Sequence, residues 1–456
     1  MCAVFGVWNH EEAARIAYLG LYAMQHRGQE SSGIVSLQQG QHYHHKGLGL
    51  VADVFKEEQL KVLPGRAAIG HNRYSTTGQN LLNNAQPLTA QLLNGSLALA
   101  HNGNLVNERS LKSELQRQGA IFQGTTDTEV LLHLLSRTKS SDLVASLQET
   151  LPQLQGAFSF VLLSHDRLIA VRDPLAFRPL VLGKKRNSEG SWAFVVASET
   201  CALDLIEAEL VREIAPGEIL SISAEGEKSV YFETYNTAVK VPKLARCIFE
   251  HVYFSRPDSV VFNHSVYEAR KNFGRWLAKE TAVDADLVIP VPDSGVPAAI
   301  GYSQQSGLPF EFGIIRNHYV GRTFIQPQQS LRSFGVKIKL NPQVAVLKGK
   351  RVVVVDDSLV RGTTSQKIIS LIRQAGAKEV HMRIASPPTT GPCFYGVDTP
   401  QKNLLIAAHS SVQEISQFIG ADSLGYLSMQ GLTEAIDSNE GYCAACFDGK
   451  YPTPLS

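Results

Sequence analysis

A cysteine stands directly behind the first methionine, in the opening sequence MCAVFG. Removal of Met1 would leave Cys2 as the terminal residue, with a thiol and a free α-amine. A terminal amine has a pKa of about 7.7–8.0, so it is able to take the proton of the thiol near neutral pH. Activation by the chain's own amine is one known way of making a nucleophile. Taken alone, these six residues favour a simpler interpretation, in which Cys2 is a small apolar residue that starts a strand.

A second candidate site lies in the sequence VVVVDDSLVRGTT. Val352–Val355 reads as a buried strand, which would place Asp356 and Asp357 at its carboxyl end, where open α/β sheets bind ligands. Arg361–Thr364 then leads into a helix, and backbone N–H groups and hydroxyls at such a turn suit a phosphate. The acidic pair is able to hold ribose hydroxyls or a Mg²⁺ ion carried by phosphates. An acidic turn that only caps the helix is the alternative, and the RGTT spacing favours the phosphate site.

The six cysteines do not resemble a disulfide framework in a chain of this length, so reduced, reactive or metal-bound thiols are expected. Cys443 and Cys446 form a CxxC pair, and Cys247 and Cys393 stand far from it in the sequence. Four such thiols suit a tetrahedral zinc ion or a cubane iron–sulfur cluster, and spacing alone leaves both open, with zinc the commoner answer. Cys201, in ASETCALD, is interpreted as a buried packing residue.

Length and composition bound the class of protein. The 456 residues are more than one hydrophobic core usually holds, so two domains are expected. Hydrophobic residues make up 44% and charged residues 19%, and the formal net charge of +1 gives no sign of a nucleic-acid or membrane partner. No apolar run approaches the roughly 18 residues that span a bilayer, and no basic segment followed by an apolar one begins the chain. A cytoplasmic location is therefore expected.

The sequence pattern changes near residue 235. Before it, short strands with Gly and Asn turns are interrupted by two helical patterns, which suggests stacked sheets flanked by helices. After it, strands and helices alternate, and residues 350–388 read as strand, loop, helix and strand, with Gly376 ending the helix. We therefore predict an α/β protein with a first domain over residues 2–235 and a second domain, built on a central parallel sheet, over residues 236–456.

The second candidate site resembles the signature of the type I phosphoribosyltransferases, which bind 5-phosphoribosyl-1-pyrophosphate (PRPP). The resemblance implies that the acidic pair contacts the ribose hydroxyls and a Mg²⁺ ion, and that the segment behind it cradles the 5′-phosphate. The PRPP-binding residues implied in this way are Asp356, Asp357, Ser358, Arg361, Gly362, Thr363 and Thr364. A second strand end, LVIPVPDSGVPAAIGY, resembles the pyrophosphate-side loop of the family and puts Ser294 near the metal. We interpret the polar, basic segment Tyr319–Lys339 as a mobile lid over PRPP.

Three clusters in the first half bear on the role of Cys2. They are GHNRYSTTG with Arg73, HNGNL with Asn102 and Gly103, and GTTDTEV with Asp127. Each is weak alone, since an arginine at a strand end, an Asn-Gly turn and a helix N-cap are common features. Their order behind Cys2 and QHRGQES resembles the class II glutamine amidotransferases, a branch of the N-terminal-nucleophile (Ntn) hydrolases. The resemblance implies an αββα sandwich for the first domain.

This second resemblance also implies a role for each residue. Cys2 would be the nucleophile, and Asn102 with the N–H group of Gly103 would form the oxyanion hole, where one donor is worth about 3–4 kcal/mol. An arginine suits the glutamine α-carboxylate because its planar fork pairs with both oxygens, and an aspartate suits the ammonium group. The resemblance gives the first role to Arg73 and the second to Asp127, and it adds Gly28 as a glutamine-binding residue in a turn close to the nucleophile. His71 and His101 are interpreted as structural.

An amidase half followed by a PRPP-binding half resembles the amidophosphoribosyltransferases, the family that commits PRPP to purine synthesis. The match runs from Cys2 to about Pro452 and includes YFSRPDS at Tyr253–Ser259 and GRTFIQP at Gly321–Pro327. It implies conversion of glutamine, PRPP and water into 5-phosphoribosylamine, glutamate and pyrophosphate, with ammonia passing internally between the two sites. It further implies a requirement for Mg²⁺, a homotetramer, and feedback inhibition by AMP and GMP.

The iron–sulfur-bearing branch of this family has cysteines in the contexts ARCIFEH, GPCFYG and GYCAACF. The resemblance therefore implies a structural [4Fe–4S] cluster in the second domain. Its ligands would be Cys247, Cys393, Cys443 and Cys446. Relatives with the cluster commonly carry a short leader that is cleaved, whereas only Met1 precedes Cys2 here, so simple removal of methionine is expected.

Two other classes of protein fit only half of the chain. Other glutamine-dependent enzymes, such as asparagine synthetases or sugar-phosphate aminating enzymes, would share the first half, but the second half has no SGGxDS-type ATP-pyrophosphatase loop. A non-catalytic PRPP-binding regulator would share the second half but would have no need of Cys2, Arg73 or Asp127. The two-site enzyme accounts for both halves.

Overall fold

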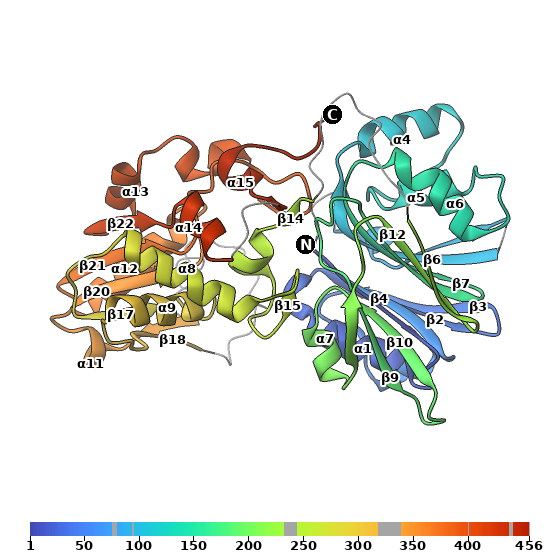
Figure 1. Ribbon diagram of the computed structural model, residues 1–456, viewed down its shortest axis with the longest axis horizontal. Helices are drawn as coiled ribbons and strands as arrows, with labels where there is room; N and C mark the ends of the chain where they lie inside the picture. Colours follow the sequence, from blue (N-terminus) through green and yellow to red (C-terminus); the bar gives the residue numbers. More distant parts are fainter. Residues whose placement is uncertain are drawn as a thin grey trace.

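The structure, a computed structural model, describes residues 1–74, 80–93, 95–231, 244–317, 339–399, 401–436 and 441–455. Two lobes lie side by side, one built from the N-terminal half of the chain and the other from the C-terminal half, and the N-terminus lies where they meet (Figure 1). The domain boundary expected near residue 235 falls outside the described residues and stays a prediction. None of the described helices has the length and apolar character that a membrane span requires.

In its described part, the first lobe contains two antiparallel sheets. The first sheet runs, from edge to edge, through β11 (Glu209–Glu213), β9 (Val181–Arg186), β10 (Trp192–Ala197), β1 (Ala3–Trp8), β4 (Ala67–Arg73), β2 (Ser31–Gln38) and β3 (Gln41–Leu48). The second runs through β13 (Gly226–Tyr231), β12 (Glu218–Ser223), β8 (Arg167–Arg172), β7 (Gly156–Ser164), β6 (Gly95–Leu105) and β5 (Leu88–Leu92). The candidate nucleophile therefore precedes an interior strand of the first sheet.

Helices cover the outer faces of both sheets. The helices of this lobe are α1 (Ala13–Ala23), α2 (Val51–Val54), α3 (Glu57–Lys61), α4 (Glu108–Arg117), α5 (Glu129–Leu135), α6 (Leu143–Thr150) and α7 (Cys201–Leu205). Side chains of β1 alternate, as strand geometry requires: Phe5 and Val7 pack outward against α1, whereas Val4 packs inward between the sheets. Cys201 is buried in the same outer core, as expected of a packing residue. The predicted αββα sandwich is confirmed.

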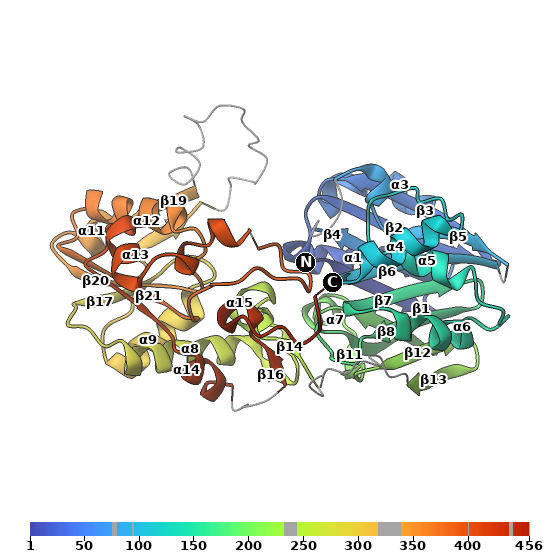
Figure 2. The ribbon, with the colours of Figure 1, turned by 90° about the horizontal axis from the view of Figure 1, so that it is seen from above.

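The second lobe is built on a parallel sheet in the order β17 (Leu287–Pro290), β20 (Arg351–Asp356), β21 (Glu379–Ile384) and β22 (Ser423–Tyr426). The valine run of β20 is buried on both faces, because Val353 and Val355 pack in one core and Val352 and Val354 in another. Figure 2 shows α12 (Thr363–Gln374) and α13 (Val412–Ile419) above the sheet and α8 (Val266–Glu280) and α9 (Val296–Ser306) below it. The predicted parallel sheet is confirmed.

Short elements complete the second lobe. They are β14 (Arg246–Cys247), the π-helical turn Glu250–Phe254, β15 (Val260–Val261), β16 (His264–Ser265), β18 (Ile314–Arg316), β19 (Leu340–Pro342), α11 (Val344–Leu347), α14 (Met429–Glu434), β23 (Tyr442–Cys443) and α15 (Ala445–Asp448). The helix expected after the phosphate loop is α12, which buries Ile368, Ile369, Leu371 and Ile372. Gly376 follows it with a φ of +92°, a conformation that favours glycine.

A buried ion network joins the lobes beside Cys2. The guanidinium of Arg27 donates from Nε to the carbonyl oxygen of Cys2 at 3.0 Å and from its two terminal nitrogens to Glu250 at 3.0 and 2.8 Å. Its first terminal nitrogen also donates to Glu199. Arg27, Glu199 and Glu250 are fully buried, so loss of one partner would leave a charge unpaired away from water. The network therefore ties the start of β1 to the π-helical turn of the second lobe.

Candidate active sites

Cys2 is held by three different elements. Its backbone nitrogen donates to Oδ1 of Asn102 on β6 at 3.1 Å, and its carbonyl oxygen accepts from Arg27. Its thiol donates to the carbonyl oxygen of Tyr74, directly after β4, at 3.5 Å. Burial, with only 8% of the residue exposed, raises the pKa of the Cys2 thiol. The side chain therefore has a defined position and needs a nearby base in order to ionise near neutral pH.

Asn102 and Gly103 follow one another on β6, next to Cys2. Asn102 is fully buried, and its Nδ2 has no hydrogen-bond partner among the described residues. Gly103 has a φ of +149°, and a Cβ atom there would lie 2.0 Å from the carbonyl oxygen of Ala157 on β7. Only glycine fits this position. The structure thus brings an unused buried donor beside the candidate nucleophile, which is what an oxyanion hole requires.

Asp127 and Arg73, the predicted glutamine-binding pair, are both buried. Asp127 precedes α5, and its Oδ2 accepts from the backbone N–H of Leu105 at 2.9 Å. Burial acts to raise the pKa of Asp127, but His101, with Nδ1 3.6 Å from Oδ1, and the hydrogen bonds outweigh it and lower the pKa. Arg73 ends β4 and lies 3.8 Å from Glu30. Asp127 therefore remains a carboxylate that is able to attract an ammonium group.

The remaining predicted residues of the first site pack around this pair. Gly28 approaches the end of β4 so closely that a Cβ atom would lie 2.5 Å from the carbonyl oxygen of Asn72. Nε2 of His71 lies 2.9 Å from the carbonyl oxygen of His101, and burial lowers the pKa of His71 to about 3. His71 is therefore neutral near pH 7, and its contact is typical of a structural histidine.

A cavity of about 580 Å³, the inter-lobe cavity, lies at the carboxyl edge of the parallel sheet. It is lined by every residue that the sequence assigned to the PRPP site: Ser294, Asp356, Asp357, Ser358, Arg361, Gly362, Thr363 and Thr364. Gly362 has a φ of +75° and caps the start of α12, whose free backbone N–H groups suit a phosphate. The structure therefore brings these residues together around one hollow.

The acidic pair of this cavity is nearly buried. Asp356 and Asp357 are each 7% exposed, and the backbone N–H of Asp357 donates to Oδ1 of Asp356 at 3.0 Å. Burial, and then the neighbouring charge of Asp357, raise the pKa of Asp356 well above its usual range. Two carboxylates held together in this way suit a divalent cation, which offsets their repulsion. The site thus fits Mg²⁺ carried by the phosphates of a ligand.

The inter-lobe cavity also has walls that sequence reasoning did not assign. His26 and Tyr74 line it from the first lobe, and Tyr253 and Asp398 line it from the second. Tyr74 joins the two candidate sites, because its carbonyl oxygen accepts from the Cys2 thiol and its hydroxyl donates to Asp398 at 3.3 Å. Tyr253 belongs to the YFSRPDS sequence, and this motif is the one feature of the sequence that pointed to any of these four residues. The segment interpreted as a lid, Tyr319–Lys339, lies outside the described residues except for Lys339.

All six cysteines are free thiols. Four of them line a small apolar cavity, the cysteine cavity. They are Cys247, Cys393, Cys443 and Cys446, and Phe177, Phe249, Tyr395 and Tyr451 are among the other lining residues. Cys247 and Cys443 are directly paired across the parallel strands β14 and β23. Among the described residues, however, no three His, Cys, Asp or Glu side chains lie close enough to hold a single metal ion.

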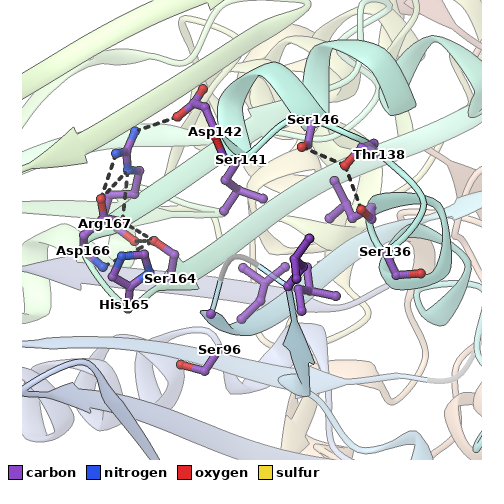
Figure 3. A pocket seen from close by; sticks show the side chains of 16 residues that line it. Ser96, Ser136, Thr138, Ser141, Asp142, Ser146, Ser164, His165, Asp166 and Arg167 are labelled. Atoms are coloured by element: carbon purple, nitrogen blue, oxygen red, sulfur yellow. Dashed lines mark hydrogen bonds and ion pairs between the residues drawn. The ribbon is translucent and has the colours of Figure 1, made fainter.

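A further hollow of about 250 Å³ lies on the first lobe (Figure 3), and none of its lining residues belongs to either candidate site. Several of its polar side chains bond to one another: Arg167 to Asp142 and Asp166, and Thr138 to Ser146. Because these groups already have partners, they leave few donors or acceptors for a ligand. We assign no chemistry to this hollow.

The comparisons with known proteins agree with this geometry. Residues 71–205 match the glutamine amidotransferase domain, and residues 268–386 match the phosphoribosyl transferase domain. The first match includes Arg73, Asn102, Gly103 and Asp127, and the second includes the residues of the inter-lobe cavity from Ser294 to Ser365. Fold and site together define a class, the glutamine-dependent phosphoribosyltransferases.

Relatives that match the whole chain identify the family within this class. The chain is 52% identical over 453 residues to the chloroplastic amidophosphoribosyltransferase of Glycine max, covering 99% of this chain and 78% of the relative. It is 50% identical over 461 residues to the amidophosphoribosyltransferase of Bacillus subtilis (strain 168), covering 100% and 94%. The solved structure of glutamine PRPP amidotransferase from B. subtilis, complexed with ADP and GMP, matches with a TM-score of 0.92 and 49% identity over 100% and 98% of the two chains. This chain belongs to the amidophosphoribosyltransferase family.

Proposed function

We propose that this chain performs the first step of purine biosynthesis by the residues described above. Glutamine, PRPP and water would become 5-phosphoribosylamine, glutamate and pyrophosphate, which is the reaction that the sequence resemblance implies, and the relatives are named amidophosphoribosyltransferases. The observation that carries the assignment of sites is the position of Tyr74. Its backbone contacts the thiol of Cys2, and its side chain lines the inter-lobe cavity. Tyr74 therefore stands between the proposed source of ammonia at Cys2 and the cavity where the ammonia would react.

In the proposed first half-reaction, cleavage of the Met1–Cys2 bond converts the backbone nitrogen of Cys2 into an amine. This amine takes the proton of the thiol, and the sulfur attacks the amide carbon of glutamine. Nδ2 of Asn102 and the N–H group of Gly103 then stabilise the oxyanion. The amine passes the proton to the departing ammonia, and water hydrolyses the thioester to glutamate. Arg73 and Asp127 would hold the α-carboxylate and the ammonium group of glutamine, with Gly28 in the adjoining turn.

In the proposed second half-reaction, the inter-lobe cavity holds PRPP. Asp356 and Asp357 would bind the ribose hydroxyls and, with Ser294, a Mg²⁺ ion that offsets the charge of the pyrophosphate. The segment Ser358–Thr364 would hold the 5′-phosphate at the start of α12. Ammonia forms a bond to C1 of the ribose as the bond from C1 to the pyrophosphate oxygen breaks.

The experiment that tests this function compares glutamine and ammonia as nitrogen donors. Cys2→Ala should abolish product from glutamine and leave product from ammonia at the wild-type rate, because only the first site is altered. Asp357→Asn should weaken turnover of PRPP with either donor and spare basal glutamine hydrolysis. Cys201→Ala, a buried cysteine outside both sites, serves as the control. A folded Cys2→Ala protein that has lost both activities would contradict the division of labour.

We further propose that the cysteine cavity holds a structural [4Fe–4S] cluster. The four cysteines that line this cavity supply the four thiolates that a cubane cluster takes, and their sequence contexts resemble those of the iron–sulfur-bearing branch. A cubane cluster spreads its four cysteines around a larger body. The apolar walls suit such a cluster because they exclude water from it. The cluster would then tie the C-terminal segment that carries Cys443 and Cys446 to Cys247 in the rest of the second lobe.

Metal analysis of anaerobically purified protein tests the cluster. We expect about four iron atoms and four acid-labile sulfide ions for each chain. Cys446→Ser should lose iron, and Cys201→Ser should keep it, since Cys201 lies outside the cavity. One zinc ion for each chain, without iron, would exclude the cluster.

Regulation and assembly are proposed on the relatives alone. The B. subtilis structure holds ADP and GMP, so we propose that purine nucleotides inhibit this chain by occupying or adjoining the inter-lobe cavity. AMP and GMP are the nucleotides to test first, in competition with PRPP. The homotetramer and the cytoplasmic location expected from the sequence stay predictions.

A further inference from the structure

Residues 393–399 of the second lobe, the bridging segment, lie between the two cavities and the first lobe. Cys393, Tyr395, Val397 and Thr399 line the cysteine cavity. Val397 and Thr399 line the inter-lobe cavity as well, together with Asp398. The segment is an irregular stretch with bends at residues 394–396 and without helix or strand, so its position depends on the contacts that it makes.

The middle of the bridging segment contacts the strand that carries the candidate oxyanion hole. Nδ2 of Asn104 on β6 donates to the carbonyl oxygen of Phe394 at 2.9 Å. Gly396 lies against the backbone of Gly103: a Cβ atom on Gly396 would be 3.0 Å from both the carbonyl carbon and the carbonyl oxygen of Gly103, and 3.2 Å from its Cα. The two glycines are therefore in direct backbone contact across the lobes.

The bridging segment is anchored independently of this contact. The carbonyl oxygen of Tyr395 accepts from Nε of Arg178, a fully buried residue of the first lobe, at 3.0 Å. The ring of Tyr395 stacks on Phe177, with 4.3 Å between the centroids, and its hydroxyl lies 2.9 Å from that of Thr453. Because Tyr395 is fixed on three sides, the neighbouring Gly396 presents a rigid surface to Gly103.

We propose that Gly396 is a positioning residue for glutamine hydrolysis: by packing against the Cα atom and the carbonyl group of Gly103, it fixes the backbone of Gly103 and therefore the direction in which the N–H group of Gly103 points at the oxyanion. The inference rests on the proposed function of Gly103. Gly103 has no side chain to pack and adopts a φ of +149°, so neighbouring backbone has to hold its peptide in place. A small displacement of such a donor is costly, since catalysis depends on geometry to a fraction of an ångström. The second lobe then completes the hydrolytic site of the first.

The test begins with Gly396→Ala. The new methyl group pushes the backbone of Gly103 away by a few tenths of an ångström, so kcat for glutamine hydrolysis should fall at least tenfold. KM for glutamine should stay within about twofold, because the groups proposed to bind glutamine do not touch Gly396, and the ammonia-dependent rate should not change. Gly226→Ala is the matched control: its φ of +104° resembles the +107° of Gly396, and no atom lies within 4 Å of the added Cβ. It should keep full activity.

Asn104→Ala provides a second variant that adds no bulk. It removes the hydrogen bond to Phe394 and should give the same split, with kcat lowered and KM retained. Because both changes act on one contact, the double variant should lose little more than the more severe single variant.

Each contrary outcome has a distinct meaning. Wild-type kcat in Gly396→Ala, or equal loss of the glutamine-dependent and ammonia-dependent rates, overturns the positioning role. Raised KM with unchanged kcat also overturns it. If the wild-type protein itself hydrolyses no glutamine, the proposed function fails instead, and the two failures are therefore distinguishable.

Discussion

Of the two polar atoms in the side-chain amide of Asn102, one is hydrogen-bonded within the described part of the chain and the other is not. Oδ1 accepts from the nitrogen of Cys2, whereas Nδ2 is buried without a partner among the described residues. A buried donor left unpaired costs about 1–3 kcal/mol of stability. Such a cost is typical of a functional site, where the missing partner is a species that forms only during the reaction. At this scale, the amide group of Asn102 is suited to two tasks in the proposed first site, one for each of its polar atoms.

Asn102→Asp separates the two roles of this side chain. Aspartate keeps an acceptor for the nitrogen of Cys2 but has no donor for the oxyanion, and its charge repels the oxyanion. We expect kcat for glutamine hydrolysis to fall by about 10²–10³. Steady-state kinetics with glutamine measures this fall, and ammonia-dependent synthesis in the same preparation should be unchanged. An activity within twofold of wild type would show that Nδ2 is not an oxyanion donor.

Helices α8 and α9 pack with their backbones in contact. A Cβ atom on Gly274 of α8 would lie 1.8 Å from the carbonyl oxygen of Ala298, and one on Gly301 of α9 would lie 1.9 Å from that of Lys271. Glycine at both positions therefore sets the distance between the helices. The consequence reaches the inter-lobe cavity, because α9 begins two residues after Ser294.

Gly301→Ala should force the two helices apart, since no side chain lies between them that is able to move away. We expect a loss of about 1–3 kcal/mol or more in the free energy of unfolding, and a raised KM for PRPP as Ser294 shifts. Thermal unfolding and ammonia-dependent kinetics measure these two effects. Gln305→Ala, at an exposed position of the same helix, should change the stability by less than about 0.5 kcal/mol. Equal behaviour of the two variants would contradict the close packing.

Local elements were predictable where one pattern specified both structure and chemistry. The run Val352–Val355 followed by an acidic pair and a turn is β20 and the start of α12, as expected. The π-helical turn Glu250–Phe254 was not predicted, although YFSRPDS overlaps its end. Its five residues are too few to show a helical pattern of apolar residues. In the structure, Glu250 bonds to Arg27, and Tyr253 and Phe254 line the inter-lobe cavity.

The lobes meet through buried polar groups, and this has a consequence for the molecule in acid. His251, next to Glu250 at the junction, is fully buried, and its Nδ1 has no partner among the described residues. Burial lowers the pKa of His251 to about 3. In the unfolded chain its pKa is about 6.5. Between these two values the unfolded chain binds a proton that the folded protein does not bind, so stability falls as the pH decreases below about 6.5.

His251→Phe should remove this part of the acid sensitivity. One unmatched proton costs about 1.4 kcal/mol for each pH unit, so the variant should lose about 2 kcal/mol less stability than wild type between pH 7 and pH 5. The shift of the denaturation midpoint with pH measures the difference. His44→Phe, at an exposed position, should retain the pH dependence of the wild type. An unchanged pH dependence in His251→Phe would show that His251 takes up its proton in the folded protein.

Sequence alone determined the types of chemical group and the local elements that carry them, because a strand–loop–helix unit or a CxxC pair is specified by neighbouring residues. Only the tertiary structure decided which distant groups meet. Tyr74 contacts Asp398, 324 positions away, and Asn104 contacts Phe394, 290 positions away. Such pairs leave no periodic trace in the sequence, since each depends on how two separately folded cores come together. The connection between the two candidate sites is therefore a property of the junction between the lobes.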